Sequence, residues 1–376
     1  MQLSSLPLNL TVVCLALAGA FAVARASAAA PFFAGADISM LPELEKAGAV
    51  YHDQDGKPAD AIKVFRDSGV NLFRLRLFVN PTHDFNKSWG ATQDLDQVRA
   101  LAKRVKSSGA RFLLDLHYSD TWADPGKQGK PAAWKDLSFD DLQKQVHDYT
   151  ASVLRDFKDA GAMPDMVQVG NEIAPGMLWP DGKVIHNGPE QQQDESWQKF
   201  AKLFDAGAKA VREASTSDHP IRVVLHIHGG GHQGLPKWFF GKFTRYSNDF
   251  DVIGLSYYPG PKENFDDLRQ NLRDVIDGWG KDVLIAEVAY PYRETDDAPD
   301  PNRKWPLTRE GQAQFVKELL DAVRAAPNGR VIGVAWWYPE AMPVKGLGIW
   351  KQGANGLFDE QGNPLPALKV FGAAAR

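Results

Sequence analysis

Cysteine is almost absent from this chain of 376 residues, since Cys14 is the only one. A single thiol cannot form an intramolecular disulfide, so the fold must be stabilised by its hydrophobic core. A large excess of one charge is also absent, because the formal net charge is −4 at pH 7. We therefore expect neither nucleic acid nor an anionic membrane to be the main partner of this protein.

Long apolar runs are confined to the N-terminus, at residues 10–23. This run is shorter than the roughly 20 residues of a membrane-spanning helix, and small-x-small cleavage patterns follow it between Ala24 and Ala28. These features predict a secretory signal peptide over residues 1–28, although no Lys or Arg precedes the run; an uncleaved anchor is the alternative. The mature protein is then expected to be secreted or periplasmic, free of cysteine, and not attached to a membrane.

Apolar runs of strand length recur after residue 28, and a helical stretch follows each of them. The predicted strands are residues 32–39, 70–79, 110–119, 165–172, 221–228, 250–259, 281–291 and 330–339. The predicted helices are residues 59–68, 95–107, 139–160, 195–214, 237–246, 265–279, 309–326 and 366–374. The strands are continuously apolar rather than alternating, which is typical of parallel strands buried on both faces.

Eight strand–helix units in a chain of this length predict an α/β fold, a single-domain (β/α)8 TIM barrel over residues 29–376. Several helices end in glycine before the next strand, as in RDSGV, KSSGA and KDAGA, and glycine commonly ends helices. A doubly wound open sheet is the alternative, but no glycine-rich phosphate loop follows the first strand. The Pro- and Gly-rich segments at residues 120–131, 174–189, 295–306 and 339–364 are interpreted as long loops after strands.

Polar or aromatic residues stand at the ends of all eight predicted strands, where a barrel builds its active site. In chain order they are Asp37; Arg74 and Arg76; His117, Tyr118, Asp120 and Trp122; Asn171 and Glu172; His226 and His228; Tyr257 and Tyr258; Glu287; Trp336 and Trp337. Any one of them has a structural explanation, such as an arginine paired with Asp115 or a buried core histidine. A polar or aromatic group at all eight strand ends is harder to explain without a functional site.

Two of these strand ends carry glutamates, Glu172 on the fourth strand and Glu287 on the seventh. Two carboxyl groups that flank one site are what glycoside hydrolysis requires. One group, kept protonated, gives its proton to the leaving oxygen. The other attacks the anomeric carbon if the two groups are about 5–5.5 Å apart, or activates water if they are farther apart.

Neighbouring residues fit the same chemistry. Asn171 is placed to hydrogen-bond a sugar hydroxyl beside the reacting carbon. Arg74 or Arg76, together with Tyr257, is expected to keep Glu287 ionised, because a nearby cation or phenol lowers the pKa of a carboxyl group.

Several segments resemble the retaining (β/α)8 glycosidases with an Asn-Glu acid/base on strand 4 and a nucleophilic Glu on strand 7. More narrowly, DLHYSDTWADP, GNE followed by LWPDG, SYYP and EVAYPY resemble the family 53 endo-β-1,4-galactanases. The resemblance implies that Glu172 is the acid/base and Glu287 the nucleophile. It also implies that the cleft is lined by His117, Tyr118, Asp120, Trp122, Asn171 and Trp179.

Two segments depart from the pattern of this family. His228 and Gly229 stand where the family usually has an Asp-Asn pair, and Trp337-Tyr338-Pro339 replaces Trp-Glu-Pro, with Glu340 displaced. Both segments border the expected cleft, so they affect the sugar preference and not the two glutamates. The residues expected to bind substrate are Asp37, Arg74, Arg76, His117, Tyr118, Asp120, Trp122, Asn171, Trp179, His226, Tyr257, Tyr258 and Trp337.

The leading hypothesis is an endo-acting retaining galactanase whose partner is a polysaccharide, β-1,4-galactan, and which acts as a monomer. Another β-glycanase of the same group, such as a mannanase, and a carbohydrate-binding barrel that has lost catalysis are the alternatives. No cofactor and no catalytic metal are expected, since the histidines show no metal-ligand spacing. Calcium binding at the acidic segment 294–302 stays open, but its spacing matches no defined calcium loop.

Overall fold

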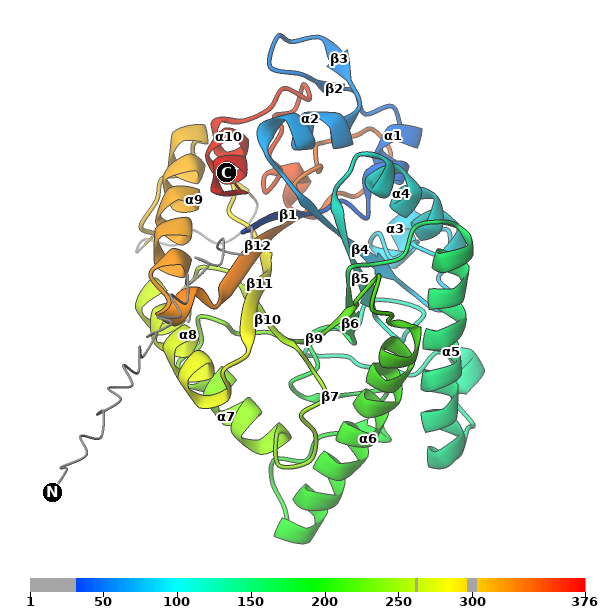
Figure 1. The fold of residues 1–376 in the computed structure, drawn as a ribbon. Coiled ribbons are helices and arrows are strands. Elements are labelled where there is room, and N and C mark those ends of the chain that lie inside the picture. The colour runs from blue at the N-terminus through cyan, green and yellow to red at the C-terminus, as the bar shows by residue number, and fades with distance from the viewer. Residues whose placement is uncertain (1–31, 261–262, 296–302, 376) are drawn as a thin grey trace, which may run out of the picture. The chain divides into compact units, whose positions relative to one another are not determined.

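The structure is a computed structural model that describes residues 32–260, 263–295 and 303–375 (Figure 1). Eight parallel strands close into a barrel, in the order β1-β12-β11-β10-β9-β6-β5-β4. They are β1 (Phe33–Asp37), β4 (Leu72–Leu77), β5 (Arg111–Leu116), β6 (Met166–Val169), β9 (Arg222–Ile227), β10 (Val252–Tyr257), β11 (Asp282–Val288) and β12 (Val331–Trp337). The predicted TIM barrel is confirmed.

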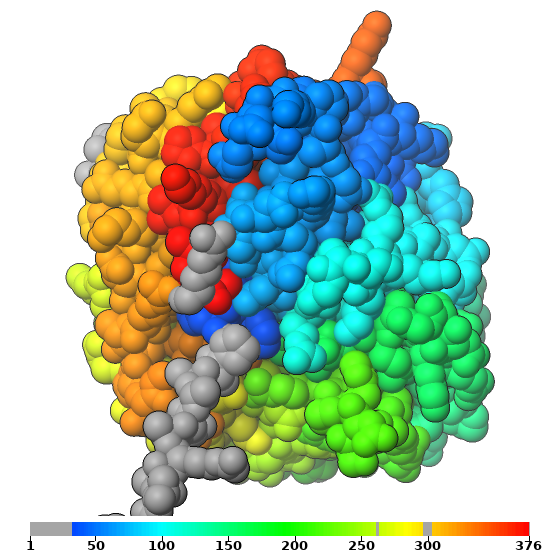
Figure 2. Space-filling view, turned by 45° about the horizontal axis from the view of Figure 1, so that its top comes forward, coloured from blue at the N-terminus to red at the C-terminus, as the bar shows by residue number. Residues whose placement is uncertain are grey.

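Helices surround the barrel on the outside (Figure 1). They are α2 (Ala61–Ser68), α4 (Leu95–Ser107), α5 (Phe139–Asp159), α6 (Glu190–Ala214), α7 (Leu235–Phe243), α8 (Phe265–Trp279), α9 (Arg309–Arg324) and α10 (Pro366–Gly372). Figure 2 shows α10, in red, beside α2, in blue. The last of these eight helices therefore packs against the first. Gly69 ends α2 with φ +111°, and a Cβ there would lie 2.3 Å from the carbonyl oxygen of Gly372. Only glycine permits both this φ and this approach.

Polar side chains at the helix N-termini explain where several helices begin. The side chains that accept a hydrogen bond from a first-turn amide are Asp60 of α2, Asp94 of α4, Ser138 of α5, Asn264 of α8 and Thr308 of α9. Each such cap stabilises its helix by about 1 kcal/mol.

The barrel interior is apolar where the strands begin and polar where they end. Residues near the strand starts form a separate buried cluster, Leu72, Leu113, Met166, Val224, Val252, Leu284, Ala286 and Ile332. Side chains alternate along a strand, so residues two or four positions later face the same interior. Arg74 and Arg76 follow Leu72 in this way, as Asp115 and His117 follow Leu113. All four are buried.

The connections contain short elements that the sequence did not predict. They are α1 (Leu41–Lys46), α3 (Phe85–Ser88), the hairpins β2–β3 (Tyr51–His52, Pro58–Ala59) and β7–β8 (Gly176–Met177, Gly182–Lys183), and the 3-10 turns η1 (Ala132–Trp134), η2 (Pro327–Gly329), η3 (Trp350–Gly353) and η4 (Ala373–Ala375). Across the described ranges, no helix has the length and apolar character that a membrane crossing requires. The predicted signal peptide, 1–28, lies outside the described residues.

Candidate active site

The strand ends open into a cavity of about 340 Å³. It is lined by Arg74, Arg76, His117, Trp122, Ala123, Asp124, Asn171, Glu172, Tyr258, Glu287, Trp337, Trp350 and Lys351. Both predicted catalytic glutamates are among these residues. Ala123, Asp124, Trp350 and Lys351 were not predicted; they lie in loops, where no periodicity marks the side of the chain that faces a cavity.

The two glutamates flank the hydroxyl group of Ser256, a residue of β10. Ser256 Oγ lies 2.7 Å from Glu172 Oε1 and 3.5 Å from Glu287 Oε2. A register shift between Leu255 and Ser256 pairs Ser256 with Glu287 on β11, and such irregularities re-aim side chains near active sites. The two carboxyl groups and one hydroxyl therefore form the centre of the site.

Glu172 follows β6 in an unusual backbone conformation. Gly170 has φ +82° and Glu172 itself has φ +50°, a left-handed conformation that costs a residue with a Cβ of order 1 kcal/mol or more. The next amide, of Ile173, donates to the carbonyl oxygen of His226 at 3.0 Å, which ties this turn to β9. The strained turn aims the Glu172 carboxyl group at Ser256.

Glu287 has two donors that stabilise its ionised form. Arg74 Nη2 lies 2.9 Å from Oε1, and the Tyr258 hydroxyl donates to Oε2 at 2.9 Å. Burial raises the pKa of Glu287 above its ordinary value, while Arg74 and Tyr258 oppose that shift. The expectation for Arg74 is met in the geometry, but the hydroxyl comes from Tyr258 and not from Tyr257.

Glu172 lies in an environment that favours its protonated form. Burial, and then the charge of Glu287, raise the pKa of Glu172 from 4.5 to about 8. Arg74 and Tyr258 contact Glu287 instead. Of the two carboxyl groups, Glu172 is therefore the one that holds a proton near neutral pH, and Glu287 is the one that is ionised.

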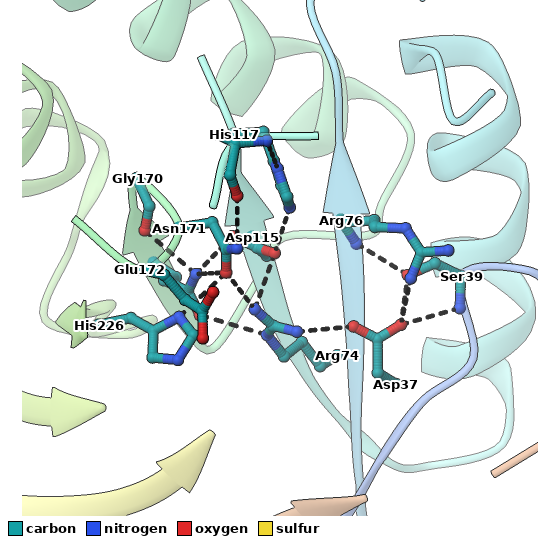
Figure 3. A network of polar contacts seen from close by, with 12 residues as sticks. Asp37, Ser39, Arg74, Arg76, Asp115, His117, Gly170, Asn171, Glu172 and His226 are labelled. Atoms are coloured by element: carbon teal, nitrogen blue, oxygen red, sulfur yellow. Dashed lines mark hydrogen bonds and ion pairs between the residues drawn. The ribbon is translucent and has the colours of Figure 1, made fainter. Parts of the chain in front are cut away.

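Arg74 is the centre of a buried polar network (Figure 3). Its guanidinium group contacts Asp37 Oδ2 at 2.8 Å, Asp115 Oδ2 at 2.8 Å and Asn171 Oδ1 at 2.9 Å, besides Glu287. Side chains on four strands and on the turn after β6 are thereby held in one arrangement. Such pairing prevents the large cost of leaving buried carboxylates without a cation.

Arg76 lies on the same strand as Arg74, but apart from Asp37 it contacts different residues, Gln93 and Trp122. It contacts Asp37 Oδ1 at 3.2 Å and Gln93 Oε1 at 3.0 Å, and its guanidinium carbon lies 4.6 Å from the ring centroid of Trp122. Arg76 therefore does not contact Glu287, contrary to one of the two predicted possibilities. Its position supports the orientation of the Trp122 ring.

Asn171 is held in one orientation by its protein partners. Its Oδ1 accepts from Arg74 at 2.9 Å and from Gln168 at 3.1 Å, and its Nδ2 donates to the carbonyl oxygen of Ala123 at 2.9 Å. An amide nitrogen carries two hydrogens, and Ala123 engages one of them. The second is available to a ligand in the cavity.

Aromatic rings form one wall of the cavity. The Trp337 ring lies at 6.2 Å from that of Trp122, at 4.8 Å from that of Trp350 and at 6.5 Å from that of Tyr258, all edge to face. Trp350 is 40% exposed. Rings fixed in this way and open to solvent on one side provide apolar faces for a ring-shaped polar ligand.

Two tyrosines that were predicted to contact substrate lie outside the cavity. Tyr118 is buried, and its hydroxyl contacts Thr150 Oγ1 on α5 at 2.7 Å. Tyr257 is buried against Phe265 on α8. Tyr257 follows the inward-facing Ser256 by one residue on β10, so strand alternation turns it toward the helices. Tyr118 lies two residues beyond the end of β5, with φ +49°.

Four further predicted residues support the site without lining the cavity. Asp37 and His226 are fully buried beneath it. Asp120 accepts from the amides of Asn80 and Ala132 and so holds loops. Trp179, in the turn between β7 and β8, donates to the carbonyl oxygen of Pro175, just before β7. All four were expected to bind substrate, but none of them is among the residues that line this cavity.

The structure also places the segment after β12, one of the two that depart from the family pattern. Tyr338, with φ +61°, lies with its hydroxyl 3.4 Å from Arg76 Nη2. Glu340 is fully buried, and its Oε1 accepts from the amide of Met40. Burial, with the charge of Asp37, raises the pKa of Glu340 to about 8. Glu340 is thus a buried residue and is not among the side chains that line the cavity.

Within the described residues, no group of three or more His, Cys, Asp or Glu side chains is arranged to hold a metal ion. The acidic segment 294–302, where calcium binding was left open, is described only as far as residue 295. That possibility therefore stays a prediction.

Comparisons with known proteins show which family this chain resembles along its length. The model of glycosyl hydrolase family 53 matches residues 33–371. An uncharacterized protein of Niallia circulans, from the bgaB 5′ region, is 40% identical over 360 residues, covering 91% of this chain and 94% of its own. An arabinogalactan endo-β-1,4-galactanase of Cellvibrio japonicus is 34% identical and covers 91% of each chain. The structure of the Ignisphaera aggregans GH53 catalytic domain superposes with a TM-score of 0.80 at 31% identity, covering 91% of this chain and 95% of that one.

Proposed function

The chain belongs to glycosyl hydrolase family 53, and from this premise we propose that it is an endo-acting, retaining β-1,4-galactanase. Its substrate would be β-1,4-galactan, including the galactan of type I arabinogalactan. The observation that carries the proposal is the pair Glu172 and Glu287 on either side of Ser256, with opposite electrostatic surroundings. A relative with 34% identity is named as an arabinogalactan endo-β-1,4-galactanase.

The spacing of the two glutamates supports retention of anomeric configuration. Each touches Ser256 Oγ, so Glu172 Oε1 and Glu287 Oε2 are separated by at most the sum of the two contacts, about 6.2 Å. Inverting glycosidases need about 6.5–9.5 Å between the carboxyl groups to admit a water molecule, and retaining ones about 5–5.5 Å. The nearest oxygens here lie below the inverting range.

The mechanism follows from the two environments. In the first step, Glu287 attacks the anomeric carbon while Glu172 protonates the departing glycosidic oxygen, which forms a covalent galactosyl ester on Glu287. In the second step, the Glu172 carboxylate takes a proton from water, and the resulting oxygen nucleophile displaces Glu287. Glu172 is protonated again and Glu287 is free, so the cycle closes.

Other residues of the cavity have positioning roles in this proposal. The remaining Nδ2 hydrogen of Asn171 would bind a sugar hydroxyl beside the reacting carbon, a contact that strengthens in the transition state. The rings of Trp122, Trp337 and Trp350 would contact the apolar faces of neighbouring galactose units. An endo-acting enzyme needs such contacts on a chain that continues beyond the reacting bond.

A polysaccharide substrate also fits the predicted location. A polymer of this kind does not cross a cell membrane, so an enzyme that cleaves it has to act outside the cytoplasm. We therefore propose that residues 1–28 direct export and that the mature protein acts as a secreted or periplasmic monomer. N-terminal sequencing of protein recovered from outside the cytoplasm, together with its mass in solution, tests this.

The function is tested by incubating the protein with linear β-1,4-galactan, mannan and xylan, and by measuring new reducing ends. We expect cleavage of galactan alone, reduced at least 10³-fold in both Glu172→Gln and Glu287→Gln. Cleavage of mannan in place of galactan would refute the substrate assignment. Binding of galactan without any cleavage would show a carbohydrate-binding barrel instead.

A further inference from the structure

The hydrogen bonds around Glu172 show whether its carboxyl group carries a proton. The starting points are groups that can only donate a hydrogen bond or only accept one. Arg74 can only donate and the Ala123 carbonyl group can only accept. Asn171 therefore turns Oδ1 toward Arg74, at 2.9 Å, and Nδ2 toward Ala123, at 2.9 Å. Gln168 Nε2 also donates to Oδ1, at 3.1 Å. Asn171 Oδ1 is thus an acceptor in every contact that it makes.

His226 is the next member of the chain. Its Nδ1 lies 3.0 Å from Asn171 Oδ1, and since that oxygen only accepts, Nδ1 must carry a hydrogen. His226 is fully buried; burial and the cation Arg74 hold its pKa well below the ordinary value, so the ring is neutral. The other charged or titratable groups that face it are Asp115, His117 and His228. A neutral ring with hydrogen on Nδ1 has a bare lone pair on Nε2.

Ser256 must then donate to His226. Its Oγ lies 2.9 Å from Nε2 of that ring, and a lone pair in a fully buried position needs a donor. A serine hydroxyl has one hydrogen, so Ser256 cannot also donate to Glu172. The 2.7 Å contact between Ser256 Oγ and Glu172 Oε1 is therefore a hydrogen bond in which Glu172 supplies the hydrogen.

We propose that Ser256 and His226 are positioning residues that hold the catalytic proton on Glu172, through a directed chain from Glu172 to Ser256 to His226 and on to Asn171. His226 and Glu172 lie side by side around Asn171 in Figure 3. The inference rests on the proposed function, because it takes Glu172 as the general acid. It adds a role for two residues that do not line the cavity.

The chain has a consequence for each step of the reaction. As the C–O bond to the leaving sugar breaks, its oxygen takes the proton of Glu172 and Glu287 bonds to the anomeric carbon. The Glu172 carboxylate is then without a hydrogen to give, and Ser256 must turn its own hydrogen away from His226 to stabilise it. In the second step, water returns a proton to Glu172 and the original direction of the chain is restored.

The two possible directions of the hydrogen bond between Ser256 and Glu172 predict opposite changes in the pKa of Glu172, so replacing Ser256 distinguishes them. If Ser256 stabilises protonated Glu172, then Ser256→Ala lowers the pKa of Glu172. If Ser256 instead donates to the carboxylate, the same variant raises that pKa. The other charged or titratable groups that face Glu172 are Glu287, Arg74, Asp124 and Tyr258, and none of them is replaced in the variant.

We expect the basic limb of the kcat/KM profile on galactan to move about one pH unit lower in Ser256→Ala, the size of one hydrogen bond to the neutral acid. Ser256→Thr, which keeps a hydroxyl group, should return the limb toward the wild-type position. An upward shift in Ser256→Ala, or no shift, would overturn the proposal.

A second measurement does not depend on catalysis or on a variant. Nitrogen-15 NMR of the imidazole groups in the wild-type protein reports which ring nitrogen carries hydrogen. We expect His226 to be neutral with hydrogen on Nδ1 at neutral pH, and hydrogen on Nε2 or on both nitrogens would contradict the chain. This result is independent of whether galactan is the substrate, so failure of the proposed function and failure of the chain are distinguished.

Discussion

Replacing Tyr258 by Phe tests the assignment of Glu287 as the ionised nucleophile. The Tyr258 hydroxyl donates to Glu287 Oε2 at 2.9 Å. A hydrogen bond to a charged group contributes about 1.5–3 kcal/mol, which corresponds to roughly 1–2 pH units in the pKa of the carboxyl group. Because Arg74 remains in place, the site keeps its cation.

The sign of the expected shift follows from which form is stabilised. Burial already raises the pKa of Glu287, and Tyr258 opposes that shift. Without the hydroxyl, the pKa of Glu287 rises further, so the acidic limb of kcat/KM on galactan should move to higher pH by roughly 1–2 units. At the optimum pH, kcat/KM should fall roughly 10- to 100-fold.

The neighbouring residue provides a matched control. Tyr257 has the same side chain, but it faces α8, and its hydroxyl lies buried without a hydrogen-bond partner in the described part of the chain. Tyr257→Phe should therefore leave the pH profile and kcat/KM unchanged within about twofold. Equal losses in Tyr257→Phe and Tyr258→Phe, or an unchanged acidic limb in Tyr258→Phe, would show that the Tyr258 hydroxyl does not stabilise ionised Glu287.

Arg74, Trp350 and Glu340 provide independent tests of the buried network, the aromatic wall and the buried acid. Arg74→Met leaves buried carboxylates without their cation, so urea unfolding at pH 7 should show a loss of about 3–5 kcal/mol; a stability equal to wild type would contradict the network. Trp350→Ala should raise KM for galactan about 5- to 10-fold with kcat unchanged. Trp238 is equally exposed, at 40%, but lies outside the cavity, so Trp238→Ala should leave KM unchanged. Glu340 has a folded-state pKa near 8, so its contribution to stability should be lost between about pH 4.5 and 8; the melting temperature of Glu340→Gln should be flatter over that range.

The barrel could be predicted from the sequence because its signals are local. Continuously apolar strands recur eight times, several helices end in glycine, and each of the eight barrel strands lies within a predicted strand. The two glutamates were found for the same reason, since a carboxyl group near the end of a continuously apolar run is conspicuous. Short elements such as α3 and β7–β8 lacked such a pattern and were missed.

The site was predicted less completely, for reasons that differ between strands and loops. On strands, the alternation of side chains would have excluded Tyr257, which stands one position out of phase with Ser256. The same alternation points Ser256 inward, although a serine in an apolar strand gives no chemical signal by itself. In loops, the position of Trp350 depends on the whole path after β12, which no local pattern encodes.

In the proposed mechanism, Glu287 carries the sugar between the two steps as a covalent ester. A galactoside with fluorine at C2 and an activated leaving group slows the second step, so the ester should accumulate; mass spectrometry of digested protein then locates it. We predict one galactosyl adduct, on the peptide that contains Glu287, and none in Glu287→Gln. An adduct on Glu172, or products of inverted anomeric configuration with no adduct at all, would contradict the account.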